Sequence, residues 1–294
     1  MSSLALASLA SAQLKGFNYG STNNDGSCRG YDDFVRFFTE AKNLASTSSP
    51  FTAARLYTSV QCGTAADPIA AFRAAVDTET AILVGLWASA GRPSYENELN
   101  ALLKGVQELG APLADRVVGV SQPQGVANNA GAGATGAEIE GYIGWLRDWA
   151  RGTPLEGKPV GHVDTWTAWV LPGNRGVADS VNFLGHNSFP YFETTRANSI
   201  DQAADNFWSA LAQTESVAGG KEVWVTETGW PHGKSTAVAN LDNARRYWHD
   251  VGCPLFGSRN TFWYTLKDAN TAQTDISFAV TPLENNTPYF DLTC

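Results

Sequence analysis

The chain has 294 residues, a length that suits either two small domains or one β/α barrel of about 250 residues. Charged residues make up 17% of it and hydrophobic residues 43%, a composition that excludes an extended disordered protein. The formal net charge of −9, a pI near 4.9 and the absence of any cluster of Lys and Arg exclude a nucleic-acid partner.

Residues 1–12 form a short apolar run that ends in Ala10-Ser11-Ala12, the small-x-small pattern of a signal-peptidase site. The run is short and no basic residue precedes it, so we expect a truncated signal peptide, followed by a single domain over residues 13–294. No other segment reaches the length needed to cross a bilayer. The sequence therefore predicts a secreted, extracellular or cell-wall protein without a membrane partner.

Short β-rich runs alternate with amphipathic segments, a pattern that predicts parallel strands joined by helical crossovers. The eight expected strands are Leu14–Tyr19, Ala53–Thr58, Ala81–Trp87, Arg116–Ser121, Pro159–Thr165, Val181–Asn187, Glu222–Thr226 and Thr261–Thr265. The predicted fold class is α/β, a (β/α)8 TIM barrel. A doubly wound open sheet is the alternative, although no Gly-rich phosphate loop follows the first strand.

The segments between the strands contain several helix signals. Tyr31–Leu44 and Glu138–Trp149 carry apolar residues at helical spacing and are expected to cover the barrel. Ser199 and Gln202 have the spacing of a capping box at the start of another helix. The crossover between Trp166 and Val181 is short and rich in Gly and Pro, so we expect the barrel to be irregular there.

Four cysteines are present, an even number that favours disulfides in a secreted chain. Of the three possible pairings we favour Cys28–Cys62 with Cys253–Cys294, because each joins segments that are close in the barrel order; buried free thiols are the alternative. His162 and His186 have no Cys or third His at ligand spacing, so neither a metal site nor a cofactor is expected.

The segment from Val223 to Pro231 carries the clearest chemical signal, because reacting groups of such barrels lie at the carboxyl ends of the strands. It is an apolar strand with a carboxylate, Glu227, at its tip, followed by Gly229 and Pro231, which turn the chain away. A carboxylate in that position is costly to bury without a partner, which indicates a functional rather than a structural role.

Further motifs follow one another along nearly the whole chain. They are Lys15-Gly-Phe-Asn-Tyr19, Ala54-Arg-Leu-Tyr57, Val84-Gly-Leu-Trp87, Glu96-Asn-Glu-Leu99, His162-Val-Asp-Thr-Trp166, Phe183-Leu-Gly-His-Asn-Ser-Phe-Pro-Tyr191 and Phe262-Trp-Tyr-Thr-Leu266. Together with the Glu227 segment, their order resembles glycoside hydrolase family 17, the β-1,3-glucanase and glucanosyltransferase family, and in particular its fungal cell-wall members.

The resemblance implies retaining hydrolysis or transglycosylation of β-1,3-glucan, in which one carboxylate is the nucleophile and a second one the general acid/base. Glu227 matches the nucleophile and should form a glycosyl-enzyme intermediate. Aromatic residues at strand ends are candidate sugar platforms, with polar side chains at the rim. These candidate substrate-binding residues are Tyr57, Trp166, Tyr191, Trp230 and Trp263, with Asn187 and His186 as hydrogen-bonding partners.

The second carboxylate is missing where the resemblance places it, just beyond the fourth strand. The chain continues from Ser121 without an acidic residue until Glu138, and Pro123 should prevent further strand pairing, so the barrel is expected to be disrupted there. Three explanations stay open: a mispredicted exon boundary, an inactivated homologue that still binds glucan, and a substitute acid, for which Asp164 is the nearest candidate.

Because loss of a general acid typically costs about 10²–10⁴-fold in rate, the chain as written is predicted to be nearly inactive. The leading hypothesis is therefore a β-1,3-glucan-active glycosidase, impaired in this chain, which binds glucan as a monomer. The alternatives are a catalytically inactive glucan-binding cell-wall protein and an interaction scaffold without carbohydrate affinity, in which the strand-end aromatic residues would be buried.

Overall fold

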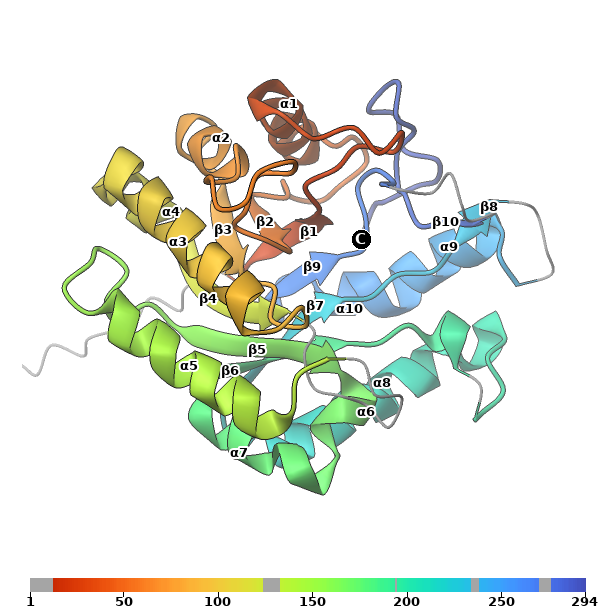
Figure 1. The fold of residues 1–294 in the computed structure, drawn as a ribbon. Coiled ribbons are helices and arrows are strands. Elements are labelled where there is room, and N and C mark those ends of the chain that lie inside the picture. The colour runs from red at the N-terminus through yellow and green to blue at the C-terminus, as the bar shows by residue number, and fades with distance from the viewer. Residues whose placement is uncertain (1–12, 124–132, 194, 234–237, 270–275) are drawn as a thin grey trace, which may run out of the picture.

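The computed structural model describes residues 13–123, 133–193, 195–233, 238–269 and 276–294. Its centre is a closed barrel of eight parallel strands in the order β1-β2-β3-β4-β5-β6-β7-β9 (Figure 1). The barrel strands are β1 (Lys15–Tyr19), β2 (Ala53–Leu56), β3 (Ala81–Gly85), β4 (Val117–Pro123), β5 (Val160–Thr165), β6 (Phe183–Asn187), β7 (Glu222–Glu227) and β9 (Thr261–Trp263). The predicted (β/α)8 barrel is confirmed, and the open sheet is excluded.

The fourth strand is longer than expected. Instead of ending at Ser121, β4 continues through Gln122 and Pro123, which pair with His162 and Val163 of β5. A proline removes one backbone donor, and the last residue of a strand tolerates that loss. The expectation that Pro123 would stop the pairing was wrong, and the barrel is closed on both sides of β4. Residues 124–132, which contain no acidic residue, lie outside the described residues.

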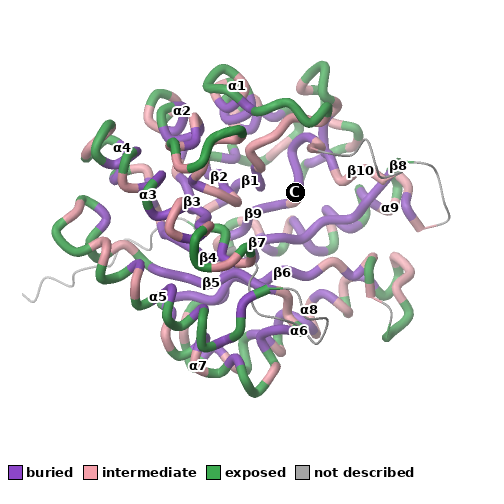
Figure 2. The backbone as a smooth tube through the Cα atoms, viewed as in Figure 1, coloured by how far each residue is buried: buried purple, intermediate pink, exposed green. Residues whose placement is uncertain are grey.

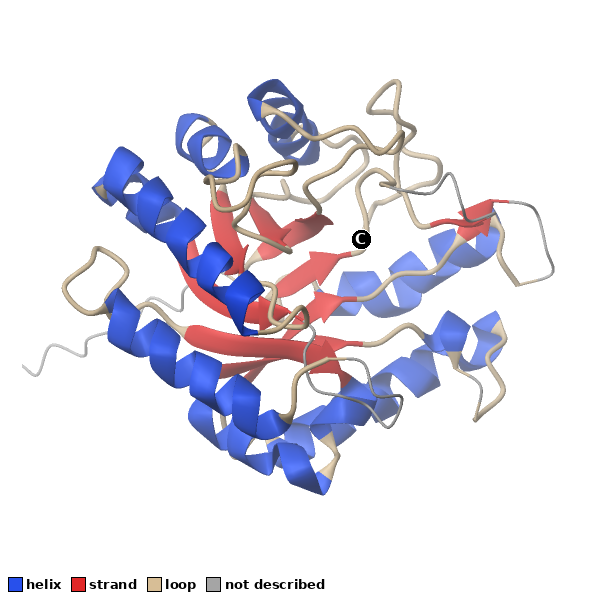
Figure 3. Ribbon diagram, viewed as in Figure 1, coloured by secondary structure: helices blue, strands red, loops and turns tan. Residues whose placement is uncertain are grey.

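Helices surround the barrel on its outside (Figure 3). They are α1 (Tyr31–Lys42), α2 (Ala71–Asp77), α3 (Arg92–Leu109), α4 (Ala111–Arg116), α5 (Gly136–Ala150), α6 (Trp166–Trp169), α7 (Arg175–Ser180), α8 (Ile200–Val217), α9 (Leu241–Tyr247) and α10 (Cys253–Leu255). Shorter turns lie at η1 (Pro172–Asn174), η2 (Pro190–Phe192) and η3 (Trp248–Gly252). The crossover after Trp166 is split into α6, η1 and α7, and is irregular as predicted. None of the described helices is long and apolar enough to span a bilayer.

The start of α8 differs in detail from the prediction. Ser199 is the N-cap residue, but its side chain donates to the Gln202 side chain and makes no hydrogen bond to the backbone. The capping box forms instead at α5, where the Thr135 hydroxyl accepts from the Glu138 amide and the Glu138 carboxylate accepts from the Thr135 amide at 2.7 Å. A capping box is therefore present at the start of α5 rather than at the start of α8.

Alternation of side chains along the strands divides the core into two layers. One buried cluster fills the barrel itself and comes mainly from the first halves of the strands: Ala53, Leu83, Phe183, Trp224 and Phe262. The larger cluster lies between the barrel and the helices, so the strands are buried on both faces (Figure 2). Because apolar side chains close the lower barrel, the polar inward-facing residues gather at the carboxyl ends of the strands.

Both favoured disulfides are present, and no described cysteine is free. Cys28–Cys62 joins the loops that follow β1 and β2, and Cys253–Cys294 joins α10 to the last residue. The alternative of buried free thiols is thereby excluded.

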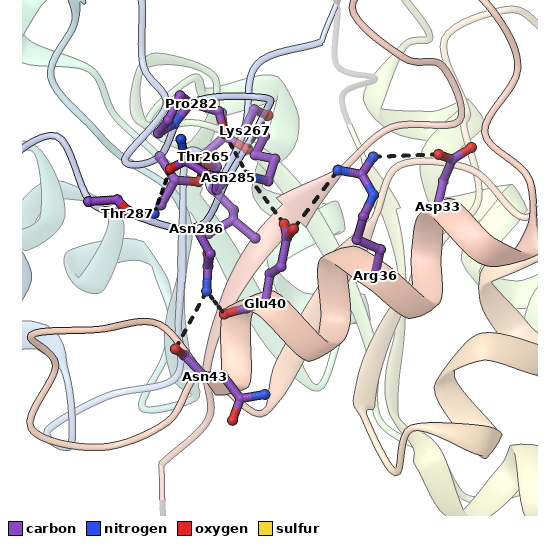
Figure 4. A network of polar contacts seen from close by, with 12 residues as sticks. Asp33, Arg36, Glu40, Asn43, Thr265, Lys267, Pro282, Asn285, Asn286 and Thr287 are labelled. Atoms are coloured by element: carbon purple, nitrogen blue, oxygen red, sulfur yellow. Dashed lines mark hydrogen bonds and ion pairs between the residues drawn. The ribbon is translucent and has the colours of Figure 1, made fainter.

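A buried lysine fixes the segment after β9 to α1 (Figure 4). The ammonium group of Lys267 lies 3.2 Å from the Glu40 carboxylate and donates to the carbonyl oxygens of Pro282 and Asn285, each at 2.6 Å. Asn286 adds a hydrogen bond of 2.9 Å to the Glu40 carbonyl. Burial lowers the pKa of Lys267. These contacts assign Lys267 a structural role in holding the carboxyl-terminal segment against the barrel.

Candidate active site

A β-bulge directs Glu227 into the mouth of the barrel. On β6 and β7, His186 pairs with Val225 but Asn187 pairs with Glu227, so Thr226 is an extra residue in the ladder. Strict alternation from the inward-facing Trp224 would turn Glu227 toward the helices; the bulge reverses this. The tip of an apolar strand thus presents a carboxylate inward, as the sequence predicts.

Glu227 is paired with a fully buried arginine. The Arg55 Nη1 atom lies 2.6 Å from Glu227 Oε1 and 2.7 Å from Asn18 Oδ1. The Arg55 side chain has no exposed surface, whereas that of Glu227 is 10% exposed. The positive charge of Arg55 is therefore compensated, and its guanidinium is held by residues of β1 and β7. The Glu227 carboxylate, in contrast, reaches the surface of the mouth. This contact lies within the barrel mouth itself.

Two tyrosines flank Glu227. Tyr57 follows β2 with its ring centroid 4.9 Å from the Arg55 guanidinium carbon, and Tyr264 follows β9 with its amide donating to the Thr228 carbonyl at 2.9 Å. Burial, and next the negative charge of Glu227, raise the pKa of Tyr57 well above its usual value and that of Tyr264 to about 12. Both hydroxyls are therefore neutral donors at working pH.

The backbone leaves no room for a larger residue beside these groups. A Cβ atom at Gly229 would lie 2.2 Å from the Tyr264 carbonyl oxygen. The turn after β7 therefore requires glycine, because the tip of β7 and the end of β9 approach this closely.

Alternation also identifies an open aromatic residue that the sequence reasoning did not single out. Trp87 follows β3 in the inward-facing series of Leu83 and Gly85, and it is 50% exposed. Tyr264 was missed in the same way, although it follows the inward-facing Phe262. Counting alternate residues along each strand from the barrel core would have found both.

Two of the expected sugar platforms are instead core residues. Trp263 is one residue out of phase with Tyr264, faces the helices and packs edge-on against Trp248 at 5.0 Å. Trp230 packs on Tyr247 at 5.5 Å and donates to the Val238 carbonyl at 2.9 Å. Each is only 2% exposed, so neither ring face is open to a sugar, and both assignments are corrected.

The remaining expected contact residues lie near the rim. Tyr57, Trp166 and Tyr191 are all partly exposed. Asn187 is buried and faces inward beside Glu227; its Oδ1 accepts from the Thr226 hydroxyl at 2.7 Å, and its Nδ2 has no hydrogen-bond partner among the described atoms.

Asp164 faces the wrong side of the barrel for a substitute acid. In the β5–β6 register it pairs with His186, an outward residue whose Nδ1 lies 2.9 Å from the Thr214 hydroxyl on α8. The Asp164 carboxylate instead contacts His162 Nε2 at 3.2 Å and accepts from the Thr165 amide at 2.7 Å. The structure therefore contradicts Asp164 as the acid partner of Glu227.

His186 is likewise not a rim residue. It is fully buried between β6 and α8, and burial lowers its pKa to about 3, so the ring stays neutral. No group of three His, Cys, Asp or Glu side chains within the described ranges is arranged to hold a metal ion.

Two other carboxylates near the carboxyl ends of the strands are occupied by structural tasks. Glu98 on α3 is buried and accepts from the Thr58 hydroxyl at 2.5 Å and the Ser59 amide at 2.6 Å. Glu138 caps α5, and hydrogen bonds from Thr135 lower its pKa. Neither is placed as a proton donor opposite Glu227.

Comparisons with known proteins give one family match and several relatives of this chain. The model of the BtgE/BtgC glycoside hydrolase domain matches residues 16–280. A probable glucan endo-1,3-beta-glucosidase of Aspergillus fumigatus is 48% identical over 304 residues, covering 99% of this chain and 67% of that protein. A glucan 1,3-beta-glucosidase of Saccharomyces cerevisiae is 26% identical over 250 residues, covering 81% of this chain and 75% of that protein.

Among solved structures, the glycoside hydrolase family 17 beta-1,3-glucanosyltransferase of Rhizomucor miehei is similar, with a TM-score of 0.76 and 25% identity over 95% of this chain and 97% of that one. An active-site mutant of that enzyme was solved with laminaritriose. The chain spans about two thirds of the length of the Aspergillus relatives it matches, between 63% and 67%.

Proposed function

The chain belongs to the family of the BtgE/BtgC glycoside hydrolase domain, and on this basis we propose that its barrel binds β-1,3-glucan with Glu227 as the nucleophile of a retaining reaction. The observation that carries the proposal is the bulge at Thr226, which turns Glu227 into the mouth beside Arg55. Glu227 would attack the anomeric carbon, the glycosidic C–O bond would break, and water or a sugar hydroxyl would then release the glycosyl group.

The surroundings of Glu227 suit an uncharged sugar chain. The exposed ring of Trp87 and the partly exposed ring of Tyr57 offer flat surfaces for sugar C–H faces, and the Tyr264 hydroxyl offers a donor to sugar oxygens. The names of the relatives, a glucan endo-1,3-beta-glucosidase and a beta-1,3-glucanosyltransferase, point to the same polymer.

We further propose that turnover of natural glucan by this chain is slow, since its sequence has no carboxylate between Ser121 and Glu138 to protonate the leaving group. The alignment with the Aspergillus fumigatus relative extends over 304 positions, more than the 294 residues of this chain, so that relative has residues with no counterpart here. A deletion that includes the acid/base residue, whether in the gene or in its exon assignment, agrees with this difference.

An activated substrate tests the nucleophile separately from the missing acid. The 2,4-dinitrophenyl β-glycoside of a β-1,3-linked disaccharide releases an acidic phenol, whose C–O bond breaks without protonation of the leaving group. Azide then attacks the anomeric carbon of the glycosyl-enzyme, the bond to Glu227 breaks, and a β-glycosyl azide is released. We expect phenol release that azide accelerates, and a β-configured azide by NMR.

The matched pair Glu227→Gln and Glu222→Gln decides the assignment, because both glutamates lie on β7 but at opposite ends of the barrel. Glu227→Gln should abolish phenol release, and Glu222→Gln should retain it. Equal rates of phenol release by the two variants would refute Glu227 as the nucleophile. If the wild-type chain binds insoluble β-1,3-glucan but releases no phenol, the inactive glucan-binding cell-wall protein is the function that remains.

We also propose that the protein acts outside the cytosol. The two disulfides are typical of secreted proteins, and β-1,3-glucan is a polymer of cell walls. Residues 1–12, where a signal peptide is expected, lie outside the described part of the chain. We propose a secreted or wall-associated monomer.

A further inference from the structure

A cavity of about 990 Å³ lies beside the barrel mouth but outside the Glu227 site. Its walls come from α9, from the small antiparallel sheet of β8 (His232–Gly233) and β10 (Ile276–Ser277), and from the carboxyl-terminal segment that Lys267 holds in place. Figure 1 shows β8 and β10 beside α9 at the edge of the barrel. The volume is at the upper end of the range of about 300–1,000 Å³ that is usual for ligand sites.

The β8–β10 sheet separates this cavity from Glu227. His232 and Ser277 pair across the sheet and both line the cavity, as does Ala279. The intervening Phe278 points the other way: it packs edge-on against Tyr264 at 5.4 Å, on the side of the β7 tip. Because neighbouring residues of an extended chain face opposite sides, the cavity and the Glu227 site lie on opposite faces of the same ribbon.

The lining of the cavity combines an exposed ring with hydrogen-bonding groups. Tyr289 is 42% exposed and Leu283 39% exposed, and together they supply an apolar surface. His232 supports the Tyr289 ring edge-on at 4.9 Å and is itself fixed by contact with the Ala279 carbonyl at 2.8 Å. The polar lining includes the carboxylates of Asp242, Asp268 and Glu284 and the carboxamides of Asn24, Asn240 and Asn243, some of which also hydrogen-bond within the protein: Asn240 Oδ1 accepts from the Asn243 amide and Asp268 Oδ1 from the Phe278 amide.

This chemistry selects an uncharged polyhydroxylated ligand. Carboxylates accept hydrogen bonds from sugar hydroxyls, carboxamides both donate and accept, and the apolar surface suits the C–H face of a pyranose ring. The described lining residues include no Lys or Arg, so phosphorylated or sulfated ligands are repelled. Asn24, Asp268 and Leu283 also border an adjoining cavity of about 460 Å³ toward α1, which is lined by Arg29 and Arg36 as well as by Asp25 and Asp33; this second space favours a chain of sugars over a single one.

We propose that this cavity is a second saccharide site, which holds a β-glucan segment beyond the residues bound at Glu227. The inference rests on the proposed function for the identity of the polymer, while the cavity, its lining and its separation from Glu227 are independent of catalysis. A second site on the same domain lengthens the stretch of polymer held, and raises affinity for long chains without changing the reacting centre.

Calorimetric titration with linear β-1,3-linked tri- and hexasaccharides tests the proposal. Tyr289→Ala should weaken hexasaccharide binding about tenfold, the effect expected for loss of one aromatic contact, and leave trisaccharide binding unchanged. Tyr289→Phe should bind like the wild type, because the ring remains. Tyr31→Ala is the matched control: it removes a tyrosine that is 40% exposed and outside the cavity.

Asp242→Ala provides a second variant in an exposed position, and decides the question if Tyr289→Ala fails to fold. It too should weaken hexasaccharide but not trisaccharide binding. Two results would overturn the proposed second site. In the first, both variants bind the hexasaccharide with wild-type affinity; in the second, they lose as much affinity for the trisaccharide as for the hexasaccharide. Azide-accelerated phenol release by the wild-type protein reports on Glu227 alone. If no such release is seen, Glu227 is rejected as the nucleophile, but a length-dependent loss of binding in the variants would still support the second saccharide site.

Discussion

Glu98 makes the stability of the barrel depend on pH in a predictable way. Its carboxylate is buried under the loops after β2 and β3, which carry Tyr57 and Trp87, and it accepts from the Thr58 hydroxyl and from backbone amides that include that of Trp87. Burial outweighs these hydrogen bonds and raises the pKa of Glu98 from 4.5 to about 7. The folded protein therefore keeps a proton on Glu98 that the unfolded chain has already released between these pH values.

Because the pKa is higher in the folded state, the contribution of Glu98 to stability is fully present below about pH 4.5 and is lost as the pH rises through 7. The difference between the two pKa values corresponds to about 3 kcal/mol in the free energy of unfolding. Urea denaturation at intervals between pH 5.5 and 8.5 measures the part of this loss that falls in that window.

Two variants isolate the contribution of Glu98 from other titrating groups. Glu98→Gln cannot ionise, so its stability should no longer decline between pH 5.5 and 8.5 by the amount seen in the wild type. Glu96→Gln changes a side chain on the same helix that is 46% exposed, and its pH profile should match the wild type. Parallel profiles for the wild type and Glu98→Gln would refute the assignment of a protonated, buried carboxyl.

Three further predictions follow from the contacts around the mouth and the carboxyl terminus. Arg55→Met should destabilise the fold by about 3 kcal/mol in urea denaturation, because it leaves Glu227 without its buried counter-charge, and the double change with Glu227→Met should recover much of that loss. Trp87→Ala should weaken β-1,3-glucan binding about tenfold in a titration with little change in Tm, because the Trp87 ring is exposed. Trp263→Ala should instead cost about 3–5 kcal/mol of stability, because the Trp263 ring is buried. Replacing both cysteines of the Cys253–Cys294 disulfide with serine should cost about 3–4 kcal/mol in the same denaturation assay, because the bond closes a loop with a sequence separation of 41. An unchanged urea midpoint for Arg55→Met would contradict the role of the buried ion pair. A lowered Tm for Trp87→Ala would contradict the exposed position of that ring, and unchanged stability without the disulfide would contradict its contribution to the fold.

The fold was predictable because its signals are local. Each barrel strand is a short β-rich run between turn residues, and all eight were placed within a few residues of their observed ends. The position of Glu227 at the tip of β7 was predictable for a related reason, because the sequence shows an apolar run that ends in an acidic residue. Both disulfides followed once the order of the strands was known.

The direction of the side chain at the tip of β7 was not predictable, because it depends on the register between β6 and β7. One extra residue, Thr226, decides that Glu227 points into the mouth, and nothing in the local sequence marks it as a bulge. Alternation alone separates Tyr264, which follows the inward-facing Phe262, from its neighbour Trp263, which faces the helices. The sequence analysis selected Trp263 and Trp230 without counting alternate residues, whereas alternation along β9 and β3 selects Tyr264 and Trp87.

Folding and turnover are separable in this chain, because β4 is held in place by contacts that do not involve the segment after it. Ser121 donates to the Val84 carbonyl at 3.2 Å, Gln122 donates to the Tyr95 hydroxyl at 3.1 Å, and the pairing with β5 runs to the end of the strand. A change in the following loop can therefore remove the general acid without opening the barrel or moving Glu227, which lies on β7. Absence of turnover on natural glucan would thus not count against the site at Glu227; only a substrate that needs no acid can test it.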